Sequence, residues 1–265
     1  MILDHLTVSN ASPIEIVQVA AQSGYSGVGL FLYKVPGVPG MCEFDIMNSN
    51  NSLQEVRFLS QELDCPVAIA YPFTLTRTST VDSFDFALDA AAEIGAQAVN
   101  LLVFDRDIAR RAEGVAGFCE RAGRRGLVVG LEFYPPSALR TLGEAVALCD
   151  MASAPNLKLT VDLLHLHRSG GTFEELAAQR DRILLAQICD APASAPEDLF
   201  YEAAADRLLP GEGALDPAGF LRACGPGVSV SIEAPCARLS GLSPELRARS
   251  ALQAARIALE IPKRH

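Results

Sequence analysis

The chain has 265 residues, with 22 Lys and Arg against 32 Asp and Glu, and therefore a formal net charge of −10. Such an acidic chain offers no electrostatic surface for nucleic acid or for an anionic membrane, and no stretch of it is long and apolar enough to span a bilayer. Seven scattered cysteines form no CxxC pair, and the N-terminal MILDHLTVSN does not resemble a signal peptide. We therefore expect a globular, cytoplasmic protein without nucleic-acid or membrane partners.

Short apolar runs alternate with helical patterns along the whole chain. The runs, which predict strands, lie at 2–8, 27–33, 65–73, 97–104, 127–134, 157–166, 183–190 and 228–235. The segments with apolar residues at three-to-four spacing, which predict helices, lie at 13–23, 50–63, 81–95, 107–125, 141–153, 173–180, 214–224 and 243–260. Helix starts are also marked by a capping residue followed by proline, at Ser12-Pro13, Asp216-Pro217 and Ser243-Pro244.

Eight strand–helix units with nearly continuous apolar strands predict a parallel sheet covered by helices. Eight such units can close into a (β/α)₈ TIM barrel, so we predict an α/β fold with a single TIM-barrel domain over residues 1–265. The alternative is an open doubly wound sheet, but no glycine fingerprint follows the first strand. The long segment between Ala191 and Ala214, after the seventh strand, is predicted to be functional.

Four consecutive strands carry an oxygen-bearing side chain where they end. These residues are Glu132, Asp162, Gln187 and Glu233. In a barrel of this type the carboxyl ends of the strands meet at one mouth, where active sites lie. Three converging carboxylates repel one another without a cation, and oxygen ligands suit Mn²⁺ or Mg²⁺, with Co²⁺ or Zn²⁺ as further options. The alternative is that each acid pairs with a distant arginine.

Two further residues are candidates for contact with a substrate. His165 follows Asp162 by three residues, and Arg207 lies in the long loop, where it can bind a substrate oxygen or carboxylate. The alternatives are a structural role for His165 and a loop ion pair of Arg207 with Asp206 or Glu202. For His167 a surface position is the preferred interpretation.

The segments GLEF, VDLLHLHRSGG, AQICDAP, ADRLLPGEGALD and SIEAP resemble the xylose isomerase-like TIM-barrel family of sugar phosphate isomerases and epimerases. The resemblance is strongest over residues 126–236. It implies that Glu132, Asp162, Gln187 and Glu233 are metal ligands and that His165 and Arg207 contact the substrate. Ketose epimerases of the family carry histidine at the position of Gln187. A glutamine at this position resembles inosose isomerase-like members and 3-dehydroshikimate dehydratases.

The resemblance implies proton abstraction next to a carbonyl, through an enediolate stabilised by one divalent metal ion. Glu132 and Glu233 would exchange protons as base and acid, with His165 as a further catalytic candidate. The expected substrate is a small sugar, polyol or hydroxy acid. An alternative is a lyase of the 3-dehydroshikimate dehydratase type, which needs a second cation for the substrate carboxylate; Lys34 and Arg77 are candidates.

Two other expectations concern assembly and inactive forms. A non-enzymatic protein that binds a sugar and a metal is a third interpretation, which the intact set of candidate site residues disfavours. The final helix, over 243–260, is expected either to cap the barrel or to pack on a partner in a homo-oligomer.

Overall fold

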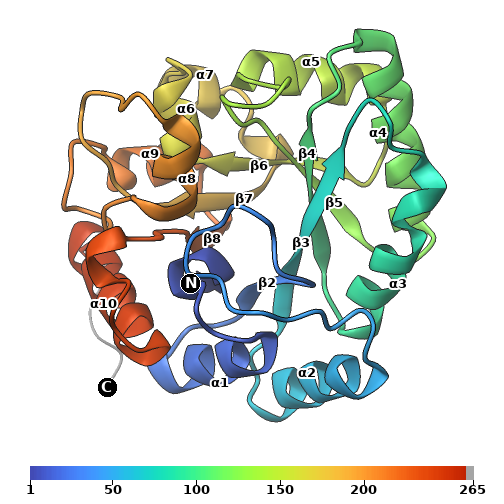
Figure 1. Ribbon diagram of the computed structural model, residues 1–265. Coiled ribbons are helices and arrows are strands. Elements are labelled where there is room, and N and C mark those ends of the chain that lie inside the picture. Colours follow the sequence, from blue (N-terminus) through green and yellow to red (C-terminus); the bar gives the residue numbers. More distant parts are fainter. Residues whose placement is uncertain (261–265) are drawn as a thin grey trace.

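Eight parallel strands form one closed barrel in the order β1 to β8, so the predicted (β/α)₈ fold is confirmed (Figure 1). The computed structural model describes residues 1–260; residues 261–265 of the predicted range lie outside them. The strands are β1 (Ile2–Asp4), β2 (Val28–Phe31), β3 (Val67–Leu75), β4 (Ala98–Val103), β5 (Val128–Glu132), β6 (Leu157–Asp162), β7 (Ile183–Ile188) and β8 (Ser229–Ile232). Pairing of Leu3 in β1 with Ile232 in β8 closes the barrel.

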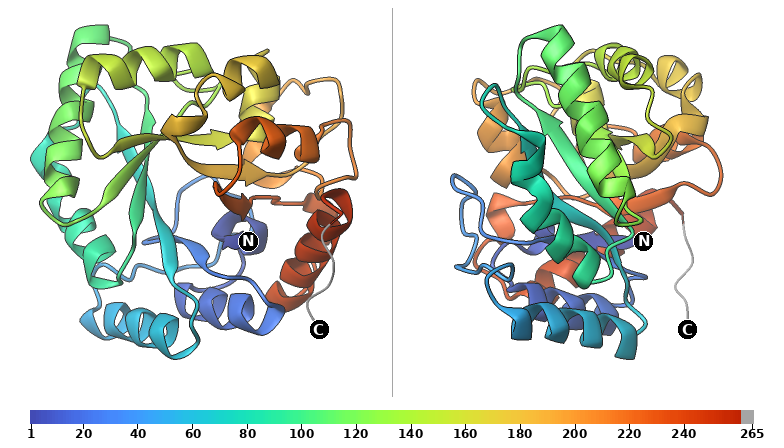
Figure 2. Two further views of the ribbon diagram at one scale, coloured as in Figure 1. Left: turned by 180° about the vertical axis from the view of Figure 1, so that it is seen from behind. Right: turned by 90° about the vertical axis from the view of Figure 1, so that its right-hand side faces the viewer.

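Helices surround the barrel, as the views from behind and from the side show (Figure 2). They are α1 (Pro13–Ser23), α2 (Asn50–Glu62), α3 (Asp85–Glu93), α4 (Ile108–Gly123), α5 (Leu142–Ala152), α6 (Leu163–Arg168), α7 (Phe173–Ala177), α8 (Leu199–Ala205), α9 (Pro217–Cys224) and α10 (Pro244–Ala258). The short 3₁₀ helices are η1 (His5–Val8), η2 (Val81–Phe84), η3 (Arg180–Arg182) and η4 (Ala237–Leu239). The last helix, α10, packs against α1, where the Tyr25 hydroxyl donates to the Ala248 carbonyl at 2.8 Å.

Side-chain caps fix several helix starts at the predicted positions. Ser12 accepts from the backbone N–H of Glu15 at 3.2 Å, and the Glu15 carboxylate accepts from the Ser12 N–H in return. This reciprocal pair satisfies donors that a helix N-terminus otherwise leaves free. Ser243 caps α10 by accepting from the backbone N–H of Leu246, so the helix starts predicted from Ser-Pro pairs are confirmed.

Seven of the eight strands are shorter than the predicted apolar runs, and in two of them, β1 and β6, an aspartate explains the difference. Asp4 ends β1 and caps η1, and Asp162 ends β6 and caps α6. The Asp162 carboxylate accepts from the N–H groups of Leu164 at 2.6 Å and His165 at 3.2 Å. His165 therefore lies on a helix rather than on the predicted strand. The segment after β7 is also more ordered than predicted, because it contains α8.

Apolar side chains fill two distinct regions of the fold. The larger region lies between the strands and the helices, and the smaller one includes Ile2, Ile69, Ala98 and Leu185 from four different strands. Since side chains alternate along a strand, Leu185 and Gln187 share one face of β7. The smaller cluster thus underlies the polar residues at the carboxyl ends of the strands.

Two further features are the oxidation state of the cysteines and the hydrophobicity of the helices. All seven cysteines are free thiols. Among residues 1–260, none of the helices combines the length and the hydrophobicity that crossing a membrane requires.

Candidate active site

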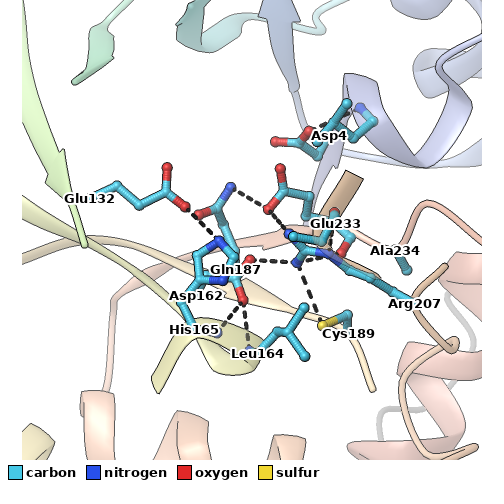
Figure 3. Close-up of polar contacts among 12 residues, drawn as sticks. Asp4, Glu132, Asp162, Leu164, His165, Gln187, Cys189, Arg207, Glu233 and Ala234 are labelled. Carbon is cyan, nitrogen blue, oxygen red and sulfur yellow. Dashed lines mark hydrogen bonds and ion pairs between the residues drawn. The ribbon is translucent and has the colours of Figure 1, made fainter. Parts of the chain in front are cut away.

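A cavity of about 280 Å³ opens at the carboxyl ends of the strands. Glu132, His165, Arg207 and Glu233 line it, and Figure 3 shows how these side chains point toward one another. This is the end of the barrel at which TIM-barrel enzymes carry their active sites. The structure therefore brings together residues that are far apart in the sequence and that were predicted separately.

Glu132 is the last residue of β5, and its buried carboxylate has two neighbours. One oxygen accepts a hydrogen bond from the Asn100 side chain on β4, and the other lies 3.5 Å from Nε2 of His165. Burial and the nearby negative charge of Asp162 raise the pKa of Glu132 to about 8. Glu132 is thus a carboxyl group that can hold or release a proton near neutral pH.

Gln187 and Glu233 stand next to each other on β7 and just after β8. The amide nitrogen of Gln187 donates to Glu233 at 3.0 Å, which leaves the buried amide oxygen of Gln187 without a protein partner. Burial raises the pKa of Glu233 well above its usual range, although the Arg207 guanidinium opposes the shift. The amide oxygen of Gln187 therefore lacks a hydrogen-bond donor, and Arg207 compensates the negative charge of Glu233 only in part.

Arg207 is turned into the barrel and is 2% exposed. Its Nη1 donates to Asp162 at 2.5 Å and to the Glu233 carbonyl at 3.1 Å, while Nη2 lies 3.3 Å from the Glu233 carboxylate. Burial alone would raise the pKa of Asp162, but Arg207 and the nearby His165 hold it well below its usual range. The alternative in which acids pair with an arginine thus applies to Asp162 and Glu233.

The alternative, a loop ion pair of Arg207 with Glu202 or Asp206, is not formed, and Glu202 pairs instead with Arg168 at 2.6 Å. The backbone of the loop is held by the side chain of Asp190, which accepts from the N–H groups of Gly211 at 3.0 Å and Leu215 at 2.9 Å. Asp190 also pairs with Leu208 through the backbone. Together these bonds fix the position from which Arg207 points inward.

His165 is buried beneath the Tyr134 ring, with the ring centroids 4.9 Å apart. Burial lowers the pKa of His165 to about 4, so its imidazole is neutral at physiological pH. His167 is exposed on the next turn, as preferred from the sequence.

The residues at the mouth fit a bound divalent cation. Oxygen atoms of Glu132 and Asp162 and a ring nitrogen of His165 lie within 4.8 Å of one another, a cluster that can hold a metal. The unpartnered oxygen of Gln187 and the raised pKa values of the two glutamates also indicate a local deficit of positive charge. Compared with the predicted acidic ligands, this cluster of carboxylate and imidazole groups contains His165 and does not include Glu233.

The sequence matches the model of the xylose isomerase-like TIM barrel over residues 17–258, which is most of the chain. The chain belongs to the xylose isomerase-like TIM barrel family. The family resemblance inferred from the strand-end motifs is thereby confirmed. No curated protein sequence matches the chain.

Solved structures share the barrel of this xylose isomerase-like protein at low sequence identity. The IolI protein, described with a binding zinc atom, has a TM-score of 0.81 and 17% identity over 98% of this chain and 97% of its own. The probable 3-DHS dehydratase AsbF from Bacillus anthracis has a TM-score of 0.76 and 16% identity over 96% and 97%. D-allulose 3-epimerase from Methylomonas sp. has a TM-score of 0.71 and 16% identity over 97% of both chains.

Two polar residues of this xylose isomerase-like barrel, Asp4 and Asn100, were not predicted. Asp4 on β1 accepts from the Tyr71 hydroxyl on β3 at 2.8 Å, and that hydroxyl lies 3.4 Å from the amide nitrogen of Gln187. Asn100 on β4 supports Glu132. Burial raises the pKa of Asp4 to about 6. Asp4 and Asn100 are each a polar residue within a short apolar run, which is the signal that identified Glu132 and Glu233.

Proposed function

We propose that the protein is a divalent-metal-dependent isomerase or epimerase of a sugar or cyclic polyol ketone, acting on the carbon next to the carbonyl. The observation that carries the proposal is the pair of buried carboxyl groups, Glu132 and Glu233, with raised pKa values on the same cavity. Groups of this kind can take a proton from carbon and return one, because burial raises their pKa values above the usual carboxyl range. Family membership and the epimerase name of one structural neighbour, D-allulose 3-epimerase, support it.

The metal would be held by Glu132, Asp162, Gln187 and Glu233, with Mn²⁺ or Mg²⁺ preferred and Co²⁺ or Zn²⁺ as further options. A bound cation supplies a Lewis acid that stabilises negative charge on the carbonyl oxygen during proton transfer. The zinc atom named for IolI supports a metal in this type of barrel. His165 is the competing ligand, because its ring nitrogen lies close to Glu132 and Asp162.

Ligand assignment can be tested with two variants. If Gln187 is a ligand and His165 is not, Gln187→Leu weakens Mn²⁺ binding at least about tenfold, whereas His165→Ala changes it little. Isothermal titration of each purified variant with Mn²⁺ measures both affinities. Strong loss in His165→Ala with no loss in Gln187→Leu would assign the site to Glu132, Asp162 and His165 instead.

The roles of the chain's own groups follow from their positions. One of the two glutamates, Glu132 or Glu233, would take a proton from the carbon next to the carbonyl, and the other would return a proton to the substrate. Neutral His165, held beside Glu132, would orient a substrate hydroxyl. Arg207 would hold Asp162 and Glu233 in place and present its remaining N–H to a substrate oxygen.

The dehydratase alternative has less support. A 3-dehydroshikimate-type substrate carries a carboxylate, and its binding calls for a cation in addition to Arg207. Lys34 pairs with Glu43 in the loop after β2, and neither Lys34 nor Arg77 lines the cavity. Within residues 1–260, Arg207 is the only lysine or arginine that lines it. The dehydratase name of one neighbour is therefore not matched by a carboxylate clamp in this chain.

Proton exchange provides the direct test of the proposed reaction. The Mn²⁺-loaded protein is incubated in D₂O with ketoses and inososes, and deuterium at the carbon next to the carbonyl is followed by NMR. We expect incorporation that falls by about a hundredfold to ten-thousandfold in Glu132→Gln and Glu233→Gln. Release of water from 3-dehydroshikimate without exchange in any ketone would favour the lyase, and no turnover of either class would contradict both.

A further inference from the structure

We infer that the substrate is a compact, uncharged sugar or cyclic polyol ketone that carries an apolar substituent in place of some of its hydroxyl groups, rather than a phosphorylated or carboxylated compound. This inference rests on the proposed function and names the substrate class of the same cavity. It comes from the division of the cavity into a charged floor and an apolar outer wall.

The outer wall is built mainly from β2, β4 and the segments that follow the strands of the first half of the barrel, with Phe200 added from α8 after β7. Its apolar lining residues include Leu6, Phe31, Val35, Leu102, Phe104 and Phe200. Glu132, His165, Arg207 and Glu233 are confined to the strand ends and the residues beside them, which form the floor. A bound molecule would therefore meet charged groups at one end and hydrocarbon over the rest of its surface.

Two aromatic rings remain exposed at the mouth of this wall. Phe104 is 40% exposed and Phe200 is 46% exposed, and Gly37 of the loop after β2 lies against the Phe200 ring. Exposed rings beside a cavity lose contact with water when an apolar group covers them, which favours binding. The loop after β2 and α8 thus form a mouth suited to an alkyl or aryl group.

Outside the floor, the uncharged polar side chains of the lining are few, namely Tyr71, Thr74, Asn100 and Tyr134, and two of them donate hydrogen bonds within the protein. The Asn100 amide donates to Glu132, and the Tyr71 hydroxyl donates to Asp4. A ligand with hydroxyl groups along its whole length would bury them against hydrocarbon, and each unpaired group weakens binding. This argues against an open-chain sugar with a hydroxyl on every carbon.

The charges of the cavity also disfavour an anionic ligand. Arg207 uses Nε on the Ala203 carbonyl at 2.8 Å and its other nitrogens on Asp162 and Glu233. Among the described lining residues Arg207 is the only lysine or arginine, whereas the carboxyl groups of Glu132 and Glu233 face the same space. Apart from the proposed metal ion, a phosphate or carboxylate would find only the N–H of Arg207 that its ion pairs leave over, and it would approach these acids. The cavity volume of about 280 Å³ also limits the ligand to a small molecule.

Three hydroxamates with the same metal-binding head and different tails test the inference. Phenylacetohydroxamate carries an aryl tail, glycolohydroxamate a hydroxyl, and phosphoglycolohydroxamate a phosphate. Isothermal titration of the Mn²⁺-loaded chain should give phenylacetohydroxamate an affinity at least about tenfold above that of glycolohydroxamate, with the phosphorylated compound weakest. Equal affinities, or a preference for the polar or phosphorylated tail, would overturn the inference and leave the proposed function standing.

Variants of the wall provide the matched comparison. Phe200→Ser and Phe104→Ser should each reduce the preference for the aryl tail at least about threefold. Phe58→Ser on α2 serves as the control, because Phe58 is 59% exposed and does not line the cavity. An equal change in all three variants would remove the support for a wall at Phe104 and Phe200.

A probe without the metal-binding head distinguishes failure of the inference from failure of the proposed function. If no hydroxamate binds the Mn²⁺-loaded chain, the proposed function is contradicted. The metal-free chain is then tested with 2-phenylethanol and glycerol by ligand-observed NMR. Binding of 2-phenylethanol alone, weakened in Phe200→Ser, supports the apolar wall, and absence of that binding overturns it.

Discussion

The two halves of the barrel mouth differ in chemistry. Strands β5 to β8 end in Glu132, Asp162, Gln187 and, just after β8, Glu233. Strands β2 to β4 and the segments that follow them supply an apolar wall that includes Phe31, Leu102 and Phe104. The fold is the same in both halves, so the difference lies in which residue occupies each strand end. One half is suited to proton transfer and the other to recognition of an apolar group.

Removal of Arg207 is expected to have the largest effect on the polar half. Arg207→Met leaves the buried charge of Asp162 uncompensated and should lower the free energy of unfolding of the metal-free protein by about 3–5 kcal/mol. Urea denaturation measures the loss. Added Mn²⁺ should restore part of the stability, because it binds the acids in the folded state.

The exposed pair of Arg222 and Asp216 provides the control for this variant. Arg222→Met should change stability little, because solvent screens the pair. A similar small change in Arg207→Met would show that Asp162 and Glu233 do not depend on the guanidinium.

The pH dependence of the free energy of unfolding tests the burial of His5 in the apolar half. Its Nε2 bonds to the Ala11 carbonyl at 2.9 Å and its Nδ1 accepts from the Phe31 N–H at 3.1 Å, and burial lowers its pKa from 6.5 to about 4. The unfolded chain binds the proton first, so the contribution of neutral His5 is complete above pH 6.5 and is lost as pH falls to 4. The loss amounts to about 3 kcal/mol.

Denaturant unfolding of wild type and His5→Gln between pH 7 and pH 4 measures this contribution. The wild type should lose more stability than the variant over that interval. Groups with raised pKa values, such as Asp4, act in the opposite direction in both proteins and cancel in the difference. Parallel pH profiles would contradict a buried, neutral His5.

Tyr71 joins the two halves, and its removal is expected to have a smaller effect. Tyr71→Phe removes the donor to Asp4 and the hydroxyl next to the Gln187 amide, so it should lower the free energy of unfolding by about 1–3 kcal/mol. Thermal unfolding measures the change, with Tyr201→Phe on the exposed face of α8 as the control. Equal melting temperatures for both variants would remove Tyr71 from the network.

The sequence predicted the barrel because apolar strands and capped helices alternate eight times. Glu132 and Glu233 were identifiable because a charge within a buried run needs a compensating partner. The same signal was present at Asp4 and Asn100 and was not used. The start of α6 was missed because the run through Leu163 and Leu164 fits a buried strand and a buried helix equally well.

The inward turn of Arg207 had no local signal. Its position depends on hydrogen bonds between Asp190 and backbone groups about twenty residues later in the chain, near Gly211 and Leu215. Its ion pairs join residues from separate strands, Asp162 and Glu233. Contacts of this range follow from tertiary structure rather than from residue spacing. The sequence therefore predicted the residue but not its ion-pair partners.

Metal content tests the central claim most directly. Wild type, Glu233→Ala and Glu202→Gln are loaded with Mn²⁺, desalted and analysed for metal and protein. Glu202 is the control, because it is also a buried glutamate paired with an arginine but lies outside the cavity lining. We expect about one ion per chain in wild type and Glu202→Gln and a loss in Glu233→Ala. Wild type without bound metal, or Glu233→Ala with a full complement, would contradict the proposed metal site.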